Sequence, residues 1–339
     1  MKLIETTRAV GHVLCHDLTQ IIPGEYKGAR FRKGHIVTGA DIPVLLSMGK
    51  EHLYVWEMSP GMLHENEAAE RLCRLCQNEG MEASEVREGK IELRAARDGL
   101  FLVDTERLNA INAIDELMIA TRHGFTPVRR GDKLCGTRVI PLIIDEKKLE
   151  AAEAAAGGEP ILRLAPYQRK TAAILTTGNE VKTGRIQDRF TPVLLQKLEA
   201  YGISAIYQEL TGDGVENIRA AIDRARSEGA DMILCTGGMS VDPDDNTPGA
   251  IKASGARIIT YGAPVLPGAM FLLGYFEDGT PIMGLPGCVM YAKATIFDLA
   301  LPRIAADLPM EKRDFVVLGE GGLCLGCESC RYPVCPFGK

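Results

Sequence analysis

Short apolar runs alternate with amphipathic stretches through the second half of the chain. Apolar runs at 171–177, 203–210 and 231–237 have the length and composition of strands. Between them, residues 190–202 and 215–229 carry apolar side chains on one helical face, with the i, i+3, i+4 and i+7 spacing clearest in the second stretch. This alternation predicts a parallel sheet with helices on its faces, in which ligands bind at the carboxyl ends of the strands.

Further apolar runs continue the pattern to residue 304. Residues 257–262, 269–276 and 280–287 predict additional strands, and the almost entirely apolar stretch 289–304 predicts a buried closing helix. We therefore expect residues 171–304 to form an α/β domain, a three-layer sandwich around a mostly parallel sheet.

The pattern before residue 146 is less regular. Helices that end at glycine are predicted at 38–49 and 63–80, and strands at 52–57 and 138–145. We therefore expect a separate α+β domain over residues 1–146.

Two connecting regions complete the predicted organisation. An alanine- and glutamate-rich stretch, broken by two glycines and a proline, predicts a linker helix and connector over residues 147–170. Residues 305–339 are expected to hold a short connector, over 305–323, and then a cysteine-rich tail.

Composition narrows the function classes. The 339 residues carry a net charge of −6, and the main basic cluster, Arg30, Arg32 and Lys33, is typical of a solvated surface rather than a nucleic-acid groove. No stretch approaches the roughly 20 apolar residues of a membrane span, and the N-terminus has no secretory signal. We expect a cytoplasmic protein with a small-molecule partner, and neither nucleic acid nor membrane.

Glycines and acidic residues gather in the loops after three predicted strands. The residues that could bind a ligand there are, in chain order, Thr177, Gly178, Asn179, Glu180, Asp188, Gly237, Gly238, Ser240, Asp244, Asp245, Gly284, Pro286 and Gly287. Backbone amides at such glycines can hold an anion, and a serine adds a hydroxyl donor. Each loop alone could be an ordinary strand-to-helix turn, but three at strand ends favour one shared site.

The second loop, "TGGMSVDPDDNTP", concentrates negative charge. Asp242, Asp244 and Asp245 would repel one another and any phosphate unless a cation joined them, and Mg²⁺ held by carboxylates and phosphate oxygens resolves this conflict. A solvated acidic turn in which Asp245 or Asn246 caps the next helix explains one aspartate, but not the paired glycines.

These motifs resemble the molybdopterin-binding domain shared by molybdopterin adenylyltransferases and molybdopterin molybdotransferases, including the catalytic parts of gephyrin. "TTGNEV" resembles S-T-G-D-E followed by Leu or Val, and "TGGMSVDPDDNTP" resembles S-G-G-x-S-x-G-x-x-D and G-G-T-G-x-x-x-x-D-x-T-P. "PGAMFLLGYFEDGTPIMGLPGCV" resembles P-G-K-P-x-x-x-G followed by G-L-P-G-N-P. The resemblance places Asp245 at the family's essential aspartate, and Asp188 at the aspartate of D-R-S-G-P. It implies a pterin dithiolene or its adenylate as ligand, with magnesium, and self-association into a homo-oligomer.

The chain also departs from that family pattern. Asn179, Asp242 and the pair Cys288 and Val289 replace family residues, and the N-terminal half lacks the Met-Asp-Gly-Tyr-Ala segment of the molybdotransferases. Their C-terminal β domain is missing as well. The resemblance therefore supports pterin binding better than any particular reaction.

Four of the ten cysteines fall in the final sixteen residues. Cys324, Cys327, Cys330 and Cys335 have the spacing C-x2-C-x2-C-x4-C, and Pro336 follows. Bacterial ferredoxins use C-x2-C-x2-C-x3-C-P for [4Fe–4S] clusters, whereas four thiolates can also hold zinc. The prediction is a metal site, with the cluster ranked before zinc and a disordered tail as the alternative. The other six cysteines are scattered, as expected of packed thiols in a reducing compartment.

Three functions remain open at this point. The first is a molybdotransferase-like enzyme of molybdenum cofactor biosynthesis that acts on molybdopterin and molybdate. The second is a non-catalytic molybdopterin carrier or redox sensor that uses the tail cluster for redox sensing or for docking to a molybdoenzyme partner. The third is a nucleotide pyrophosphatase that resembles the competence-damage proteins.

Overall fold

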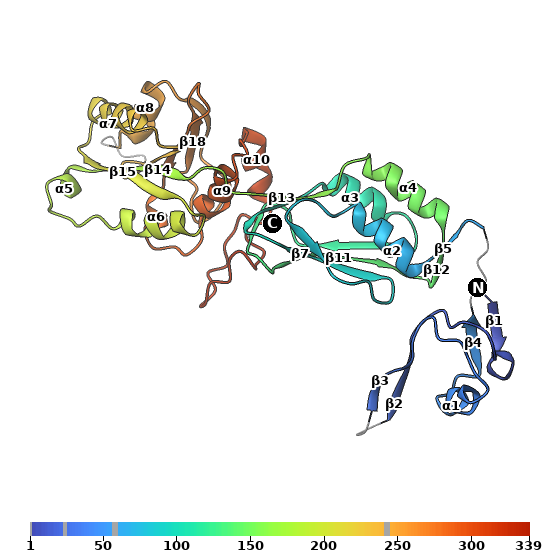
Figure 1. The fold of residues 1–339 in the computed structure, drawn as a ribbon. Helices are drawn as coiled ribbons and strands as arrows, with labels where there is room; N and C mark the ends of the chain where they lie inside the picture. Colours follow the sequence, from blue (N-terminus) through green and yellow to red (C-terminus); the bar gives the residue numbers. More distant parts are fainter. Residues whose placement is uncertain (1, 23–25, 56–59, 241–244) are drawn as a thin grey trace. The chain divides into compact units, whose positions relative to one another are not determined.

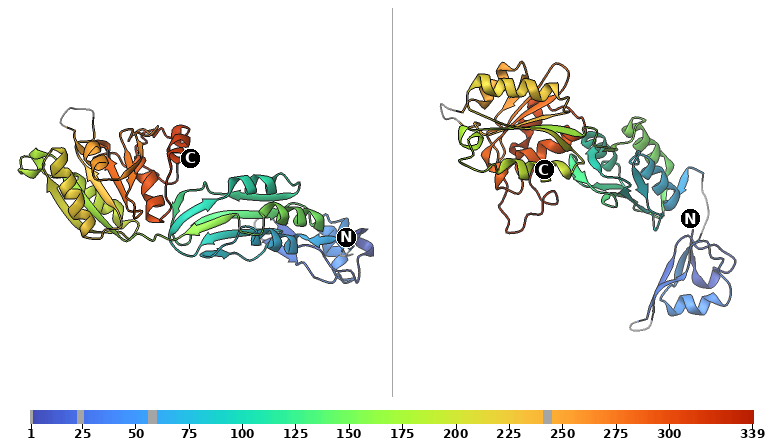
Figure 2. Two further views of the ribbon diagram at one scale, coloured as in Figure 1. Left: turned by 90° about the horizontal axis from the view of Figure 1, so that it is seen from above. Right: turned by 60° about the vertical axis from the view of Figure 1, so that its left-hand side comes forward.

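The computed structural model describes residues 2–22, 26–55, 60–240 and 245–339. Two compact units divide the chain (Figures 1 and 2). One contains residues 1–97, 103–124 and 130–164, and the other contains residues 98–102, 125–129 and 165–339.

The first unit begins with two antiparallel strand pairs and a short helix. β1 (Lys2–Glu5) pairs with β4 (His52–Val55), and β2 (Leu18–Ile22) pairs with β3 (Tyr26–Phe31). α1 (Asp41–Ser47) lies between β3 and β4 in the sequence, and the 3-10 turn η1 (Thr6–Arg8) follows β1. Leu14, Leu45, Leu53 and Val55 are among the residues that form their core.

A four-stranded antiparallel sheet follows, in the order β6-β7-β11-β9. Its strands are β6 (Met81–Ala83), β7 (Lys90–Ala95), β11 (Lys133–Val139) and β9 (Leu117–Thr121). Helices α2 (Glu65–Arg74), α3 (Thr105–Asn112) and α4 (Glu146–Ala156) accompany the sheet, and Figure 1 shows them together on one side. Burial alternates along β7, with Ile91, Leu93 and Ala95 buried, as expected of a strand with one apolar face.

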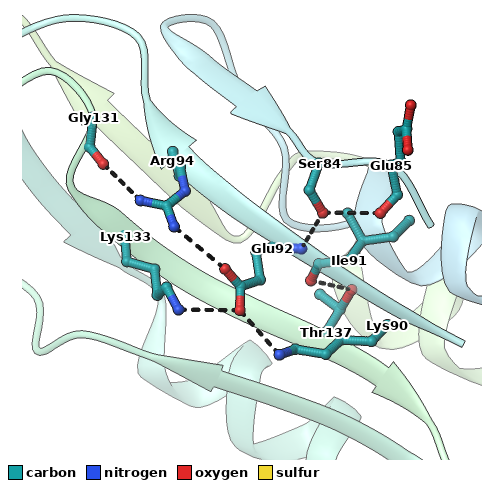
Figure 3. Close-up of polar contacts among 9 residues, drawn as sticks. All are labelled: Ser84, Glu85, Lys90, Ile91, Glu92, Arg94, Gly131, Lys133 and Thr137. Carbon is teal, nitrogen blue, oxygen red and sulfur yellow. Dashed lines mark hydrogen bonds and ion pairs between the residues drawn. The ribbon is translucent and has the colours of Figure 1, made fainter. Parts of the chain in front are cut away.

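The opposite face of β7 is polar. Glu92 forms ion pairs with Lys90 at 2.9 Å, Lys133 at 3.1 Å and Arg94 at 3.6 Å (Figure 3). Hydrogen bonds from Lys90 and Lys133 lower the pKa of Glu92 to about 2.

The predicted strand at 138–145 is wrong as a single element. β11 ends at Val139, and β12 (Ile143–Asp145) instead pairs with β5 (Met62–His64) in a separate two-stranded sheet. Pro141 lies between them, and a proline has no N–H for a sheet hydrogen bond. The helix expected at 63–80 occupies only Glu65–Arg74. His64 caps its N-terminus, where the His64 Nδ1 accepts a hydrogen bond from the Asn66 N–H.

Unit two contains a six-stranded sheet in the order β15-β14-β16-β19-β18-β17. The strands are β14 (Thr171–Thr177), β15 (Ser204–Thr211), β16 (Ile233–Thr236), β17 (Arg257–Tyr261), β18 (Leu272–Tyr275) and β19 (Pro281–Leu285). β15, β14, β16 and β19 are parallel, and β18 runs antiparallel to both of its neighbours. The unit also holds the antiparallel pair β8 (Gly99–Val103) and β10 (Thr126–Val128). β13 (Leu162–Ala165) precedes β14.

Two cores cover the two faces of this sheet. α6 (Phe190–Glu199) and α9 (Ile296–Ala305) pack on one face through residues such as Leu194 and Phe297. α7 (Val215–Ser227) and α8 (Thr247–Ala253) pack on the other through residues such as Ile222 and Ile251. Figure 1 shows α7 and α8 on the side of the sheet opposite α6. The three-layer, mostly parallel architecture is therefore confirmed.

Two predictions at the end of this unit are wrong. The closing helix does not begin at residue 289, because 3-10 turn η2 (Gly287–Met290) comes first and Thr295 caps α9 in a capping box with Asp298. The segment 305–323 is not merely a connector, since it contains α10 (Lys312–Val316), with a buried Phe315, and the 3-10 turn η3 (Val317–Gly319). No helix in the described part of the chain is long and apolar enough to cross a membrane.

Candidate ligand-binding site

A cavity of about 430 Å³ lies where β16 and β19 end. The predicted residues Gly237, Gly238, Ser240, Pro286 and Gly287 line it. Seven residues that sequence reasoning did not select complete the walls: Phe190, Met239, Met270, Leu285, Cys288, Met290 and Tyr291. The volume falls within the range of small-molecule sites, which combine apolar walls with a few placed polar groups.

The paired glycines let three parts of the domain approach closely. Gly237 has a φ of +80°, and a Cβ there would lie 2.4 Å from the Thr177 carbonyl oxygen. Gly238 has a φ of +55°, and its Cβ would lie 2.8 Å from Thr247 Oγ1. Any larger residue at 237 would therefore clash with fixed backbone as well as adopt an unfavourable backbone conformation.

Threonines connect the strand ends beneath these glycines. Thr247 Oγ1 donates to the Gly237 carbonyl at 2.8 Å and lies 3.3 Å from Thr177 Oγ1. Thr236 Oγ1 donates to Thr176 Oγ1 at 3.2 Å. All four threonines are buried, so the hydrogen bonds satisfy polar groups that have left water and fix the relative positions of β14, β16 and α8.

Asp188 lies at the beginning of α6 and accepts four hydrogen bonds. Its Oδ1 accepts from the backbone N–H groups of Phe190 at 2.8 Å and Thr191 at 3.2 Å. Its Oδ2 accepts from Thr191 Oγ1 at 2.5 Å and Thr176 Oγ1 at 3.4 Å. An ionised carboxylate offers about four acceptor positions. Asp188 would therefore bind a metal ion only by giving up some of these bonds.

The loop after β14 faces the neighbouring loop after β15. The Asn179 N–H donates to Asp213 Oδ2 at 3.0 Å, and the Asp213 N–H donates to Asn179 Oδ1 at 3.3 Å. Gly178 adopts a φ of +135°, and Glu180 is exposed in the short helix α5 (Asn179–Lys182). Thr177, Gly178, Asn179 and Glu180 are not among the residues that line the cavity.

The acidic loop after β16 is described only from Asp245 onwards. Asp242 and Asp244, which the sequence singled out, lie outside the described residues. Burial raises the pKa of Tyr261, and the nearby Asp245 carboxylate raises it further. The Tyr261 hydroxyl also donates to the Met239 carbonyl at 3.4 Å, so this tyrosine links the acidic loop to the cavity wall.

Gly284 serves the cavity indirectly. A Cβ at this position in β19 would lie 2.6 Å from both Sδ and Cε of Met239. Met239 is buried and lines the cavity. The missing side chain at Gly284 therefore makes room for the Met239 thioether.

The four tail cysteines line a second cavity, of about 270 Å³, in the same unit. Cys327 and Cys330 are exposed, Cys324 and Cys335 are half-buried, and all four are free thiols. Among the described residues, the side chains of His, Cys, Asp and Glu form no group of three or more in a metal-binding arrangement.

Fold and cavity define an α/β ligand-binding domain with its site at the carboxyl ends of parallel strands. Residues 173–306 match the family model described as "Probable molybdopterin binding domain". This match confirms the family resemblance for this domain, which is related to molybdenum cofactor biosynthesis proteins. The matched residues make up less than half of the chain. Residues 3–57 match a second model, described as "Domain of unknown function (DUF8806)".

Curated relatives match shorter parts of the chain. A "CinA-like protein" of Mycobacterium sp. (strain JLS) is 37% identical over 76 residues, which is 22% of this chain and 18% of the relative. A "Putative competence-damage inducible protein" of Bacillus cereus (strain AH187) is 34% identical over 95 residues, 28% of this chain and 23% of the relative. The chain thus spans about a fifth of the length of these relatives.

Solved structures overlap with about two-fifths of the chain. The molybdopterin biosynthesis Mog protein from Mycobacterium ulcerans has 23% sequence identity and a TM-score of 0.32, over 41% of this chain and 91% of that one. The protein CinA from Thermoplasma acidophilum has 18% identity and a TM-score of 0.35, over 40% of this chain and 98% of that one.

Proposed function

We propose that the second unit binds molybdopterin or adenylyl-molybdopterin in the cavity at the ends of β16 and β19. The single observation that carries this proposal is the cavity itself, because it lies within the matched domain and residues from two of the three motif loops form its walls. Three methionines and two aromatic side chains offer polarisable surfaces to a flat pterin ring: Met239, Met270, Met290, Phe190 and Tyr291.

The glycine-rich end of the cavity suits the anionic part of the ligand. Ser240 supplies a hydroxyl donor, and backbone N–H groups at Gly237 and Gly238 are the kind of donor that binds phosphate. Thr177 and Thr247 are buried behind these glycines, and the Thr247 hydroxyl donates to the Gly237 carbonyl at 2.8 Å. The polar end would therefore be preorganised, which lowers the entropic cost of binding.

Magnesium would complete the site at the acidic loop. Mg²⁺ binds one or two carboxylates together with phosphate oxygens, and we assign Asp245 to this role, with Asp244 beside it in sequence. When bound, the ion would neutralise phosphate charge. Asp188 would act by holding Thr176, Thr191 and the start of α6 in place.

The reaction that we propose is molybdate insertion with release of AMP. Phosphoryl chemistry of this kind depends mainly on positioning and charge neutralisation, which loops, a carboxylate and a magnesium ion can supply. The likeness of the matched domain to molybdenum cofactor proteins supports this assignment.

The test is a turnover assay on the full chain purified without oxygen, with adenylyl-molybdopterin, magnesium and molybdate. We expect molybdate-dependent AMP release that Asp245→Ala abolishes. Asp223→Ala, at an exposed position on α7, removes a carboxylate elsewhere and should leave the rate unchanged. AMP release without molybdate, or equal rates in both variants, would contradict the proposal.

A non-catalytic pterin carrier is the second candidate, and one observation favours it. Asn179 stands where the resembling families have an aspartate, and its side chain is engaged with Asp213. A carrier would bind the pterin tightly in the same cavity and release no AMP. Cleavage of a dinucleotide in the absence of pterin would instead identify a nucleotide pyrophosphatase.

A further inference from the structure

The cysteine-rich tail is folded against the second unit. The Leu266 N–H donates to the Gly322 carbonyl at 2.8 Å, and the Cys324 N–H donates to the Leu266 carbonyl at 2.8 Å. The Tyr332 hydroxyl donates to the Asp298 carbonyl of α9 at 2.6 Å. Phe337 is only 4% exposed and belongs to the core beneath α6 and α9. The tail therefore has a defined place in the domain.

This placement gathers all four tail cysteines around one cavity. Cys324, Cys327, Cys330 and Cys335 all line the cavity of about 270 Å³. In two-cluster ferredoxins the fourth cysteine of such a run serves a different cluster, so spacing alone leaves the role of Cys335 open. Here Cys335 lines the same cavity as the other three. The four thiols do not yet form a metal-binding group, so a single centre would require the loops that carry them to close around it.

We propose that these four cysteines bind a [4Fe–4S] cluster. Zinc bonds thiolate sulfur at about 2.3 Å, so four thiolates close around a single ion and leave no space between them. The four cysteines here instead line a cavity of about 270 Å³. This volume fits a multi-atom cluster, as does the run of three C-x2-C-spaced cysteines.

The cavity walls also suit an anionic centre. Four thiolates carry four negative charges, and thiolate-bound clusters are sensitive to charge in their surroundings. Lys293 and Arg331 line the cavity beside the cysteines, while Tyr332 and Phe337 close its apolar side.

The cluster site adjoins the proposed pterin site through one stretch of backbone. Residues 285–288, 290 and 291 line the pterin cavity, and residues 292–294 line the cysteine cavity. The Lys197 ammonium of α6 donates to the Lys293 carbonyl at 3.2 Å, which ties this stretch to the helix that begins beside the pterin cavity. The cluster would thus hold one wall of the pterin site in position, an inference that rests on the proposed function.

Metal analysis of the full chain tests the cluster. After anaerobic purification and reconstitution with ferrous iron and sulfide, we expect about four iron and four sulfide per chain, with the visible absorption of an iron–sulfur cluster. Cys327→Ser and Cys330→Ser should lose most of the iron, and both positions are exposed, so the fold should survive. Glu328→Gln, the matched control, changes an exposed tail residue that lines neither cavity and should keep the iron.

The outcomes separate the two parts of the proposal. One zinc per chain without iron, no metal, or unchanged iron in Cys327→Ser would overturn the cluster. If the wild type binds the pterin and Cys327→Ser loses iron, we expect at least a fivefold weaker pterin affinity in that variant. Unchanged affinity would overturn the link between the sites and leave the cluster in place. Failure of the wild type to bind pterin would refute the proposed function, while the iron content still decides the cluster.

Discussion

Gly284→Ala offers a direct test of how the cavity is built. The added methyl group would lie 2.6 Å from the Met239 thioether, whereas carbon atoms at ordinary contact are about 3.5–4.0 Å apart. Met239 must therefore move by about 1 Å. Its other surroundings are a closely packed core, so the space open to it is the cavity that it lines.

Gly284→Ala should lower the stability of the second unit only slightly but should weaken pterin binding more strongly. Overpacking a core costs about 1–3 kcal/mol of stability. Because the methionine side chain is flexible and can adjust, we expect Gly284→Ala to cost about 1 kcal/mol. For a domain of this size, the melting temperature should then fall by about 2–4 °C. Pterin affinity should fall about tenfold or more, equivalent to 1.4 kcal/mol, because the displaced thioether occupies part of the cavity.

Thermal unfolding and pterin titration of the same samples measure both quantities. The double variant Gly284→Ala with Met239→Ala should recover most of the affinity, since the obstructing side chain is removed. Gly249→Ala is the matched control, because its methyl group would meet only Val215 at 3.8 Å, an ordinary contact. Unchanged affinity in Gly284→Ala, or no recovery in the double variant, would refute this account of the cavity wall.

Three further predictions concern stability. Phe337→Ala should lower the free energy of unfolding by about 3–5 kcal/mol, because the ring is buried in the core. Chemical denaturation will measure this loss, and a negligible change would mean that the tail does not dock against the domain. Asp298→Asn should destabilise the second unit by about 3–5 kcal/mol. The change leaves the Lys197 ammonium, whose side chain is only 14% exposed, without its carboxylate partner, and it also weakens the helix cap at Thr295. Hydrogen bonds lower the pKa of Glu92 from 4.5 to about 2, so its contribution to stability is present above pH 4.5 and is lost as the pH falls towards 2. Unfolding curves of Glu92→Gln and the wild type should therefore differ at pH 6 and converge in acid, and a constant difference would contradict this assignment.

Much of the second unit could be predicted from the sequence. Alternation of strands and helices between residues 171 and 262 depends on local periodicity, and apolar positions such as Ile218 and Ile222 do face the core. Glycines at 237 and 238 were also informative, because positive φ angles and close backbone approach restrict those positions to glycine. The motif loops therefore indicated the end of the sheet at which the cavity lies.

Apolar patterns failed at two places, one decided by a local helix cap and the other by a non-local strand pairing. The apolar run from residue 289 looked like one helix, but the Thr295 and Asp298 capping box delays the start of α9 to Ile296. Likewise, Pro141 and the pairing of β12 with β5 split a run that looked like one strand. Apolar composition alone does not show where a helix is capped or which strand supplies a partner.

By itself, the sequence determined the class of the second domain, two of the loops that line its cavity and the four thiols of its tail. Only the tertiary structure decided which side chains meet. It brought Phe190 and Met270, 80 residues apart in the chain, to one cavity, engaged all four acceptor positions of Asp188, and brought Cys335 to the same cavity as Cys324. The physical reason is that periodicity and backbone conformation are set within a few residues, whereas a cavity is enclosed by side chains that only the packing of distant elements brings together.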